Sequence, residues 1–209
     1  MHSIINSLEW RYATKKFDPT KKIKADDFEQ ILKALSLSAS SYGLQPYKFF
    51  VVENQELRQE LVQHSWNQRQ VADASHLLVM ASRTAVDKDF VQDFNELFAK
   101  YRGIGKEQVA NRTKFMVESI EKRSPEEIAN WCASQTYIAL GNLLTVCADM
   151  RIDTCPMEGF SKAAYNKLLG LENTEYTSTL VCPIGYRSTD DQTQNARKVR
   201  RQKLVEIIK

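Results

Sequence analysis

The chain has 209 residues, of which 43% are hydrophobic and 26% are charged. These proportions are typical of a soluble globular protein and exclude a disordered or fibrous chain. The 29 Lys and Arg against 26 Asp and Glu leave a net charge of +3, which is too small for a general nucleic-acid binder. The balance is compatible with one local anion site, and we expect residues 1–209 to form a single domain.

Four cysteines are spread along the chain without a CxxC pair or a partnered histidine. This spacing argues against a structural zinc site, so we expect no metal and interpret the cysteines as buried, reduced thiols. The N-terminus has no basic segment followed by an apolar one, and no apolar run approaches the length of a membrane span. We therefore expect a soluble cytoplasmic protein without a membrane or nucleic-acid partner.

Helical periodicity dominates the first half of the chain, interrupted by two short apolar runs. Residues 4–12 and 28–35 place apolar side chains at helical spacing, which predicts two helices. The runs 48–53 and 76–81 are continuous and apolar, as expected for strands covered on both faces.

A further helix is predicted where aromatic side chains recur over residues 90–101, and it should end before Gly103. The segment 100–122 is polar and lacks a clean apolar stripe. Two interpretations of this segment stay open: a mobile excursion over a site, and a plain surface helix.

The strongest helix start in the chain is Ser124, followed by Pro125 and, three residues after the cap, by Glu127. Serine caps a helix, proline fits its first turn, and Glu127 can reach back to the cap. The predicted helix runs to about Met150 and is apolar on most sides, so we expect it to be central and buried. The remaining predicted elements are a short strand near 152–155, a helix over 161–169, a strand over 178–182 and a last strand over 204–208.

Familiar nucleotide fingerprints are absent. The run Gly103-Ile104-Gly105 lacks the third glycine of a dinucleotide turn, and position 100 is Lys where a phosphate loop needs its first glycine. Side-chain cations are the other means of holding a phosphate, and Arg11 with the pair Lys198 and Arg200 supplies guanidinium and ammonium groups. Taken alone, however, the C-terminal cluster is better explained as a solvated basic segment.

Four other features also have ordinary explanations when each is taken alone. Ser40-Ser41 and Glu158-Gly159 are typical turn residues, and a lone Trp66 is usually core packing. Asp73 and His76 suggest an acid–base pair, but His76 opens an apolar strand and is interpreted as structural. No serine or cysteine has a convincing base nearby, so nucleophilic catalysis is not supported.

Taken together, the clusters resemble the nitroreductase family along essentially the whole chain. More narrowly, the chain looks like the branch of oxygen-insensitive NAD(P)H nitroreductases and dihydropteridine reductases, which are FMN flavoproteins. The resemblance implies an α+β fold with helices around a central mixed β-sheet, in an intertwined homodimer with two FMN sites at its interface. The residues that carry it are 11–18, 38–47, 73–76, 141–142, 156–160 and 198–200.

The resemblance implies a phosphate site built from both ends of the chain. Arg11, Lys198 and Arg200 are expected to bind the FMN phosphate. Ser40 and Ser41 are expected to come from the other subunit, which makes dimerisation a condition for cofactor binding.

The resemblance also assigns residues to the flavin ring. Asn67 is expected at the pyrimidine edge, and the N–H groups of Glu158 and Gly159 at flavin N5 and O4. Lys15 is expected near N1 and O2, where negative charge accumulates on reduction, so Lys15 and Glu158 are the expected catalytic residues. The full expected cofactor set is Arg11, Tyr12, Ala13, Lys15, Ser40, Ser41, Gly43, Asn67, Gln70, Pro156, Glu158, Gly159, Lys198 and Arg200.

The chain departs from the family pattern at three positions. Ala13 stands where many relatives have serine, and Gln70 stands where a lysine is common, which leaves Lys15 with more of the charge stabilisation. Met116 after Phe115 stands where relatives often have a bulky aromatic over the site. The expected substrate residues are Tyr42, Trp66, Phe115 and Met116.

The expected activity is ping-pong hydride transfer from NADH or NADPH, through FMN, to a flat electron-poor acceptor such as a nitroaromatic or a quinone. Neither an acidic ribose-reading residue nor an arginine for a 2′-phosphate can be assigned, so both nicotinamide donors are kept. Two alternatives stay open. One is another flavin activity of the same fold, namely dihydropteridine reduction, dehalogenation or flavin fragmentation; the other is a basic-tailed binding protein without flavin.

Overall fold

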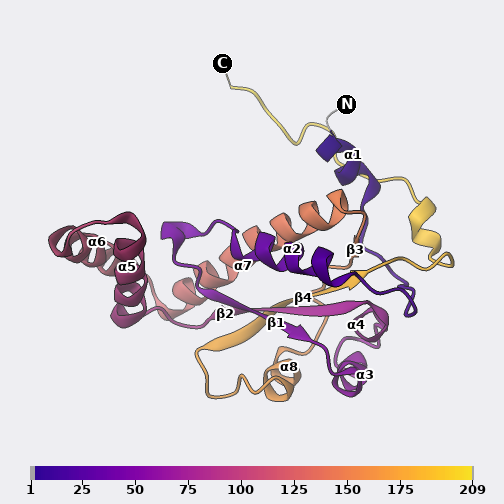
Figure 1. Cartoon of the computed structure of the whole chain (residues 1–209), viewed down its shortest axis with the longest axis horizontal. Helices are drawn as coiled ribbons and strands as arrows, with labels where there is room; N and C mark the ends of the chain where they lie inside the picture. The colour runs from indigo at the N-terminus through magenta and orange to yellow at the C-terminus, as the bar shows by residue number, and fades with distance from the viewer. Residues whose placement is uncertain (1–2, 209) are drawn as a thin grey trace.

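The computed structural model describes residues 3–208. It is an α+β arrangement around a four-stranded sheet of order β1-β2-β4-β3 (Figure 1). Every strand pair in this sheet is antiparallel. The expected mixed sheet is therefore wrong for the described residues, where parallel pairing is limited to an isolated bridge between Ala13 and Thr154. The strands are β1 (Tyr47–Val52), β2 (His76–Arg83), β3 (Asp153–Thr154) and β4 (Tyr176–Gly185).

Helices cover both faces of the sheet (Figure 1). The α-helices are α1 (Ser3–Trp10), α2 (Ala25–Ser36), α3 (Gln55–Gln63), α4 (Gln70–Asp73), α5 (Lys88–Arg102), α6 (Lys106–Ile120), α7 (Pro125–Asp149) and α8 (Lys162–Leu168). Two short 3-10 turns are η1 (Ser41–Gly43) and η2 (Gln192–Asn195).

The alternation of side chains along β2 divides the core between these two layers. Leu78 and Met80 pack with residues of α2 and α7, whereas Leu77 and Val79 pack with residues of α3, α4 and α8. Successive side chains of a strand point to opposite faces, and here both faces are apolar. The prediction of strands covered on both sides is confirmed.

The long helix α7 is confirmed from its cap to its end. Ser124 Oγ accepts from the Glu127 N–H at 3.3 Å, and Glu127 Oε2 accepts from the Ser124 N–H at 2.7 Å. The helix ends at Asp149, and its inner face, which includes Leu143 and Cys147, is fully buried. α7 is thus the main helix of the layer that covers one face of the sheet.

Helices α5 and α6 form an arm that projects from one end of the molecule (Figure 1). α5 ends at Gly103, whose φ of 64° is the left-handed conformation that glycine favours. Residues 106–120 are helical, as the surface-helix interpretation of this segment predicts. A third cluster, which includes Val91, Met116 and Cys132, joins the arm to the start of α7.

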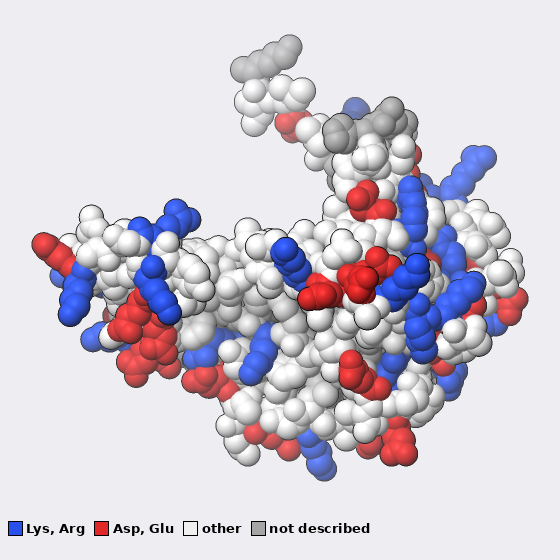
Figure 2. Space-filling view, viewed as in Figure 1, with Lys and Arg blue, Asp and Glu red and all other residues white. Residues whose placement is uncertain are grey.

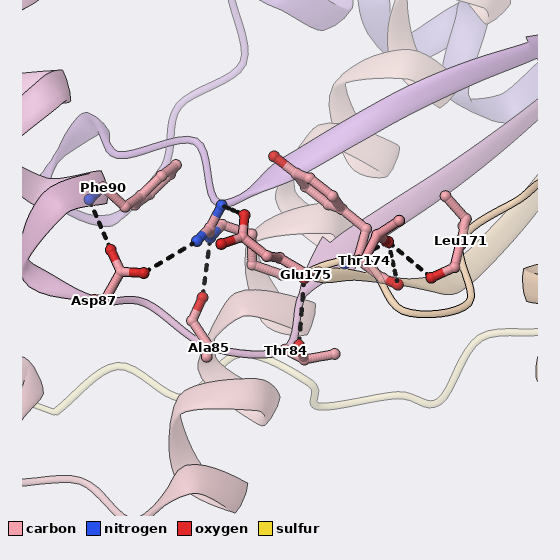
Figure 3. A network of polar contacts seen from close by, with 9 residues as sticks. Thr84, Ala85, Asp87, Phe90, Leu171, Thr174 and Glu175 are labelled. Atoms are coloured by element: carbon pink, nitrogen blue, oxygen red, sulfur yellow. Dashed lines mark hydrogen bonds and ion pairs between the residues drawn. The ribbon is translucent and has the colours of Figure 1, made fainter.

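A buried arginine anchors the base of this arm (Figure 3). Arg83, at the end of β2, donates to the Ala85 carbonyl at 3.0 Å and to Glu175 Oε2 at 2.5 Å. Its guanidinium also lies 4.2 Å from the ring centre of Phe90. Asp87, whose side chain caps α5 by accepting from the Phe90 N–H at 2.8 Å, lies 3.8 Å from the same guanidinium.

Two predictions at the chain ends are wrong. The first helix ends at Trp10, so Tyr12 is not on its face. Residues 204–208 form no strand, and Leu204 and Ile208 are 70% and 93% exposed. A strand needs a neighbour to pair its N–H and C=O groups, and this segment has none within residues 3–208. No helix in that range combines the length and the apolar character that crossing a membrane requires.

The four cysteines are buried and free, as predicted. Burial raises the pKa of the Cys132 thiol to about 11 and that of Cys147 to about 12. Both thiols therefore remain protonated at neutral pH, which suits packing rather than nucleophilic chemistry.

Candidate functional site

The cations of the two chain ends meet on one side of the molecule. Lys198 Nζ donates to the Arg11 carbonyl oxygen. The pKa of Lys198 is lowered, first by burial and then by the positive charges of Arg11 and Arg200. Figure 2 shows Lys and Arg side chains gathered on the side where both termini lie. A pocket of about 330 Å³ opens there, with Tyr12 and Lys198 in its wall.

This cation cluster lacks its counter-charge. Arg11 Nε is buried and has no hydrogen-bond partner among the described residues, and an unpaired buried donor is strongly unfavourable. Within residues 3–208, no ion pair involves Arg11, Lys198 or Arg200. A phosphate group supplies what is missing, because its oxygens accept several charge-assisted hydrogen bonds at once. The predicted phosphate residues therefore fit such a group.

Asp191 joins the two chain ends, and sequence reasoning missed it. Its Oδ2 accepts from Tyr12 Oη at 2.9 Å and from the N–H groups of Lys15 and Lys16 at 2.8 and 3.2 Å. Its Oδ1 accepts from the Thr193 N–H at 2.9 Å. Burial would raise the pKa of Asp191, but these hydrogen bonds outweigh it and the pKa is lowered. Its position before the polar run 192–195, where it caps η2, was the only local signal.

Sequence reasoning also missed Arg187, whose positive charge is paired with the carboxylate of Asp153. Its guanidinium lies 4.2 Å from the ring of Trp10 and 4.5 Å from that of Tyr12. Arg187 Nε donates to the buried Asp153 carboxylate at 2.8 Å. This pairing fixes the position of Trp10, the last residue of α1, and of Tyr12, which follows the helix. Arg11 Nε, in contrast, is a buried donor without a partner among residues 3–208.

Lys15, Gln70 and Arg11 converge on buried Cys155. Burial raises the pKa of the Cys155 thiol, the charges of Lys15 and Arg11 act in the opposite direction, and the charge of Asp191 adds to the effect of burial. The bridge from Ala13 to Thr154 lays the Lys15 segment along β3. The Lys15 side chain is exposed, Gln70 is buried and Pro156 is half-buried beside them. The structure thus places Lys15 and Gln70 in the neighbourhood of Cys155 and Pro156.

A tight contact fixes the adjacent turn at Gly159. A Cβ atom added to Gly159 would lie 2.7 Å from Cε3 of Trp66, so only glycine lets the indole approach this closely. Gln68 Nε2 donates to the Gly159 carbonyl at 3.3 Å. Trp66 and Asn67 are consecutive residues in the left-handed region, with φ of 53° and 58°. Trp66 is 76% exposed, so its interpretation as core packing is wrong.

The Glu158–Gly159 turn presents free backbone donors. Met157 is paired with Val181 in both directions, and Phe160 N–H donates to the Glu158 carbonyl. The N–H groups of Glu158 and Gly159 themselves form no hydrogen bond within the part of the chain that the structure describes. Two adjacent N–H groups in a turn that Trp66 and Gln68 contact suit an acceptor-rich ring edge.

The serine turn lies elsewhere on the chain. Ser41 N–H donates to Gln135 Oε1 at 2.8 Å, whereas Ser7 of α1 donates to Asp149 at the far end of α7, at 3.2 Å. Gln135 and Asp149 are 14 residues apart, about 21 Å of helix. Ser40 and Ser41 are therefore not beside the Arg11 cluster in one chain.

The serine turn is shaped by its own residues and by α6. Gly43 has a φ of 75°, and Ser40 Oγ accepts from the Gln45 N–H at 2.9 Å. Tyr42 Oη is 2.9 Å from Ser119 Oγ, and the Tyr42 carbonyl accepts from Arg112 at 3.0 Å. The arm therefore holds this turn.

Only one of the two neighbouring residues expected over the site reaches the surface. Phe115 is 62% exposed, with its ring centre 6.3 Å from that of Tyr42. Met116 is fully buried against Asn95, so its expected contact with a substrate is wrong. Adjacent helical residues point about 100° apart, and α6 turns Phe115 outward and Met116 inward.

The structure does not support an acid–base pair of Asp73 and His76. Asp73 pairs with Arg69 at 2.7 Å. His76 stacks on Phe28 with ring centres 3.8 Å apart, and its pKa is lowered mainly by burial. His76 is thus structural, as predicted.

The chain is similar to known proteins over most of its length. The model described as "Nitroreductase family" matches residues 8–186. A Bacillus subtilis (strain 168) protein named "Putative NAD(P)H nitroreductase YfkO" is 36% identical, with 90% of each chain covered. A Staphylococcus epidermidis protein named "Putative NAD(P)H nitroreductase SERP2086" is also 36% identical, with 94% of this chain and 93% of its own covered.

Solved structures share the fold. The nitroreductase-type protein ydfN of Bacillus subtilis superimposes with a TM-score of 0.87 at 19% identity, with 98% of each chain covered. A protein of Exiguobacterium sibiricum, solved in complex with FMN, gives a TM-score of 0.80 at 21% identity, with 94% of this chain and 92% of its own covered.

Proposed function

The chain belongs to the nitroreductase family, and on this premise we propose that it is an FMN-dependent NAD(P)H oxidoreductase. The observation that carries the proposal is the buried Nε of Arg11, which has no hydrogen-bond partner among the described residues, within a cluster of cations that forms no ion pair there. The FMN complex of the similar Exiguobacterium sibiricum protein supports the choice of cofactor.

The residues present fit FMN at both of its ends. Arg11, Lys198 and Arg200 would hold the phosphate, because they combine a free guanidinium donor with two further cations. The free N–H groups of Glu158 and Gly159 would face N5 and O4 of the ring. In this proposal Tyr12, Ala13, Gln70 and Pro156 would line the path between these two groups, and Asn67 would meet the pyrimidine edge.

Bound FMN would accept a hydride from NADH or NADPH and pass it on to a second substrate in a ping-pong sequence. Lys15 carries the chain's own contribution to this chemistry, because an exposed ammonium near N1 and O2 stabilises negative charge on the ring. Trp66 and Phe115 are exposed aromatics. Trp66, which lies beside Gly159, would exclude water from a flat slot in the site of its own chain, whereas Phe115 and Tyr42, which lie at the serine turn, would do so in the site of the partner chain. Such a slot suits an electron-poor aromatic acceptor, a nitroaromatic or a quinone.

The proposal includes a homodimer. One phosphate cannot contact both the Arg11 cluster and the serine turn of the same chain, whose attachment points on α7 are about 21 Å apart. We therefore assign Ser40 and Ser41 to the site of the partner chain. The exposed apolar residues of the C-terminal segment, among them Val205 at 83% and Ile207 at 79% exposure, support a partner surface.

The test is spectroscopic. The purified protein is titrated with FMN, its visible spectrum is recorded, and NADPH or NADH is added without oxygen. We expect a yellow protein that loses its flavin absorbance with one of the donors and regains it with a quinone. A colourless protein that takes up no FMN would end the proposal.

A further inference from the structure

The Glu158–Gly159 turn places a carboxylate beside two free backbone donors. The N–H groups of Glu158 and Gly159 have no acceptor within residues 3–208. Carboxylates accept strongly from backbone N–H groups. The Glu158 side chain is exposed. If nothing held it, its carboxylate would fold back and accept hydrogen bonds from these two N–H groups.

Tyr137 provides the restraint. It projects from α7, and its hydroxyl donates to Glu158 Oε1 at 2.8 Å. The pKa of Tyr137 is raised, first by burial and then by this bond and by the negative charge of Glu158. The phenol therefore remains protonated, and remains a donor, throughout the neutral range.

The main chain of the turn is held from the opposite side. Gln68 Nε2 donates to the Gly159 carbonyl at 3.3 Å, and the indole of Trp66 lies so close to Gly159 that a Cβ atom added there would be 2.7 Å from its Cε3. The turn is thus fixed by the 66–68 loop and its carboxylate by α7. The two N–H groups lie between these two restraints.

We infer that Tyr137 is a positioning residue that holds the Glu158 carboxylate away from the Glu158 and Gly159 N–H groups, so that both donors stay open for a ligand. The inference rests on the proposed function, because the ligand edge is that of FMN. It has an electrostatic consequence as well. A carboxylate held away from the ring opposes the build-up of negative charge there less than a free one does.

Three variants test the inference: Tyr137→Phe, Glu158→Ala and the double variant. The Phe variant keeps a ring that is 44% exposed in the protein, so folding is expected to be retained. Two quantities are measured: amide exchange of residues 158 and 159 in the FMN-free protein, and the FMN dissociation constant by quenching of flavin fluorescence. Tyr101→Phe, at an 80% exposed tyrosine of α5, is the matched control.

We expect Tyr137→Phe to slow both amide exchange rates and to weaken FMN binding by about tenfold, the effect of one charge-assisted hydrogen bond. Glu158→Ala and the double variant should resemble each other in amide exchange and in FMN affinity, because no carboxylate remains to close the donors. Tyr101→Phe should change nothing.

Two results would overturn the inference. The first is unchanged amide exchange in Tyr137→Phe. The second is a loss of FMN affinity that persists in the Glu158→Ala background, since the phenol would then act through packing alone. A wild-type protein that binds no FMN refutes the proposed function, and the exchange rates still decide the role of Tyr137.

Discussion

At the scale of single residues, the carboxylate of Asp191 accepts hydrogen bonds from segments that lie at opposite ends of the chain. Its lowered pKa means that the folded protein favours the charged form. The stabilisation is fully present above the ordinary value of 3.8 and is lost as the pH falls through the lower folded value. Lys15 and the C-terminal cations both depend on this contact for their placement.

We expect Asp191→Asn to lower the free energy of unfolding by about 2 kcal/mol at neutral pH, because a charged acceptor of several bonds is lost. The variant should also lose part of the acid sensitivity of the wild type below pH 3.8. Urea unfolding at several pH values measures both effects. Asp190→Asn, at an exposed residue paired with Lys16, is the control and should change stability by less than about 0.5 kcal/mol.

Lys15 is expected to act on the rate of flavin reduction rather than on cofactor retention. Its side chain is exposed, and it is not among the charges that act on Lys198, which are those of Arg11, Arg200 and Arg187. Lys15→Ala should leave FMN bound and slow its reduction by NAD(P)H about tenfold or more, the effect of removing one preorganised charge. Stopped-flow absorbance measures this rate. Lys16→Ala is the control, and equal rates in both variants would remove Lys15 from the mechanism.

At the scale of elements, the arm formed by α5 and α6 depends on the anchor at Arg83 (Figure 3). Arg83 is 5% exposed, whereas the Asp87 and Glu175 side chains are more than half exposed. Removal of the arginine therefore leaves no buried carboxylate without a partner. The loss comprises the Ala85 hydrogen bond, the ion pairs with these two exposed carboxylates and the contact with Phe90.

We expect Arg83→Met to lower the free energy of unfolding by about 2 kcal/mol. Arg102→Met is the control, because this exposed arginine also stacks on a ring of α5, that of Phe98 at 5.4 Å; its effect should stay within about 0.5 kcal/mol. Denaturant unfolding measures both. Equal effects of the two variants would show that Arg83 stabilises the protein no more than the exposed Arg102 does.

The C-terminal segment is the second element with a specific expectation. Lys198→Ala with Arg200→Ala should raise the FMN dissociation constant by more than about tenfold, because two charge-assisted contacts to the phosphate are lost. The matched control removes the neighbouring cations, Arg201→Ala with Lys203→Ala. If both double variants bind FMN equally well, the segment acts only through its net charge.

At the scale of the whole molecule, the separation of the serine turn from the Arg11 cluster predicts sites shared between two chains. One chain carries Arg11→Ala and the other carries Ser40→Ala with Ser41→Ala. In a mixed dimer of shared sites, both defects fall in one site and the other site is intact. We expect the mixed dimer to bind FMN with wild-type affinity at one site of two, unlike either parent. Titration of a doubly tagged, purified mixed dimer tests this, and two equally weakened sites would contradict it.

Sequence reasoning succeeded where the signal is local. The capped helix from Ser124, the strands at 47–52 and 76–83 and the end of α5 at Gly103 all follow from periodicity, caps and glycine within a few residues. It failed where the partner is distant or absent. The strand expected at 204–208 has no neighbour to pair with, and Met116 differs from Phe115 only in its direction from α6.

The sequence by itself determined which residue types are available: the cations near both termini, the serine pair, the glycine of the 158–159 turn and the apolar strands. Only the tertiary structure decided which of them meet. The bonds from Asp191 to Lys15 and from Lys198 to Arg11 join residues 176 and 187 positions apart. The physical reason is that local patterns encode the direction of a side chain relative to its own element, whereas such long-range contacts arise only when whole elements pack.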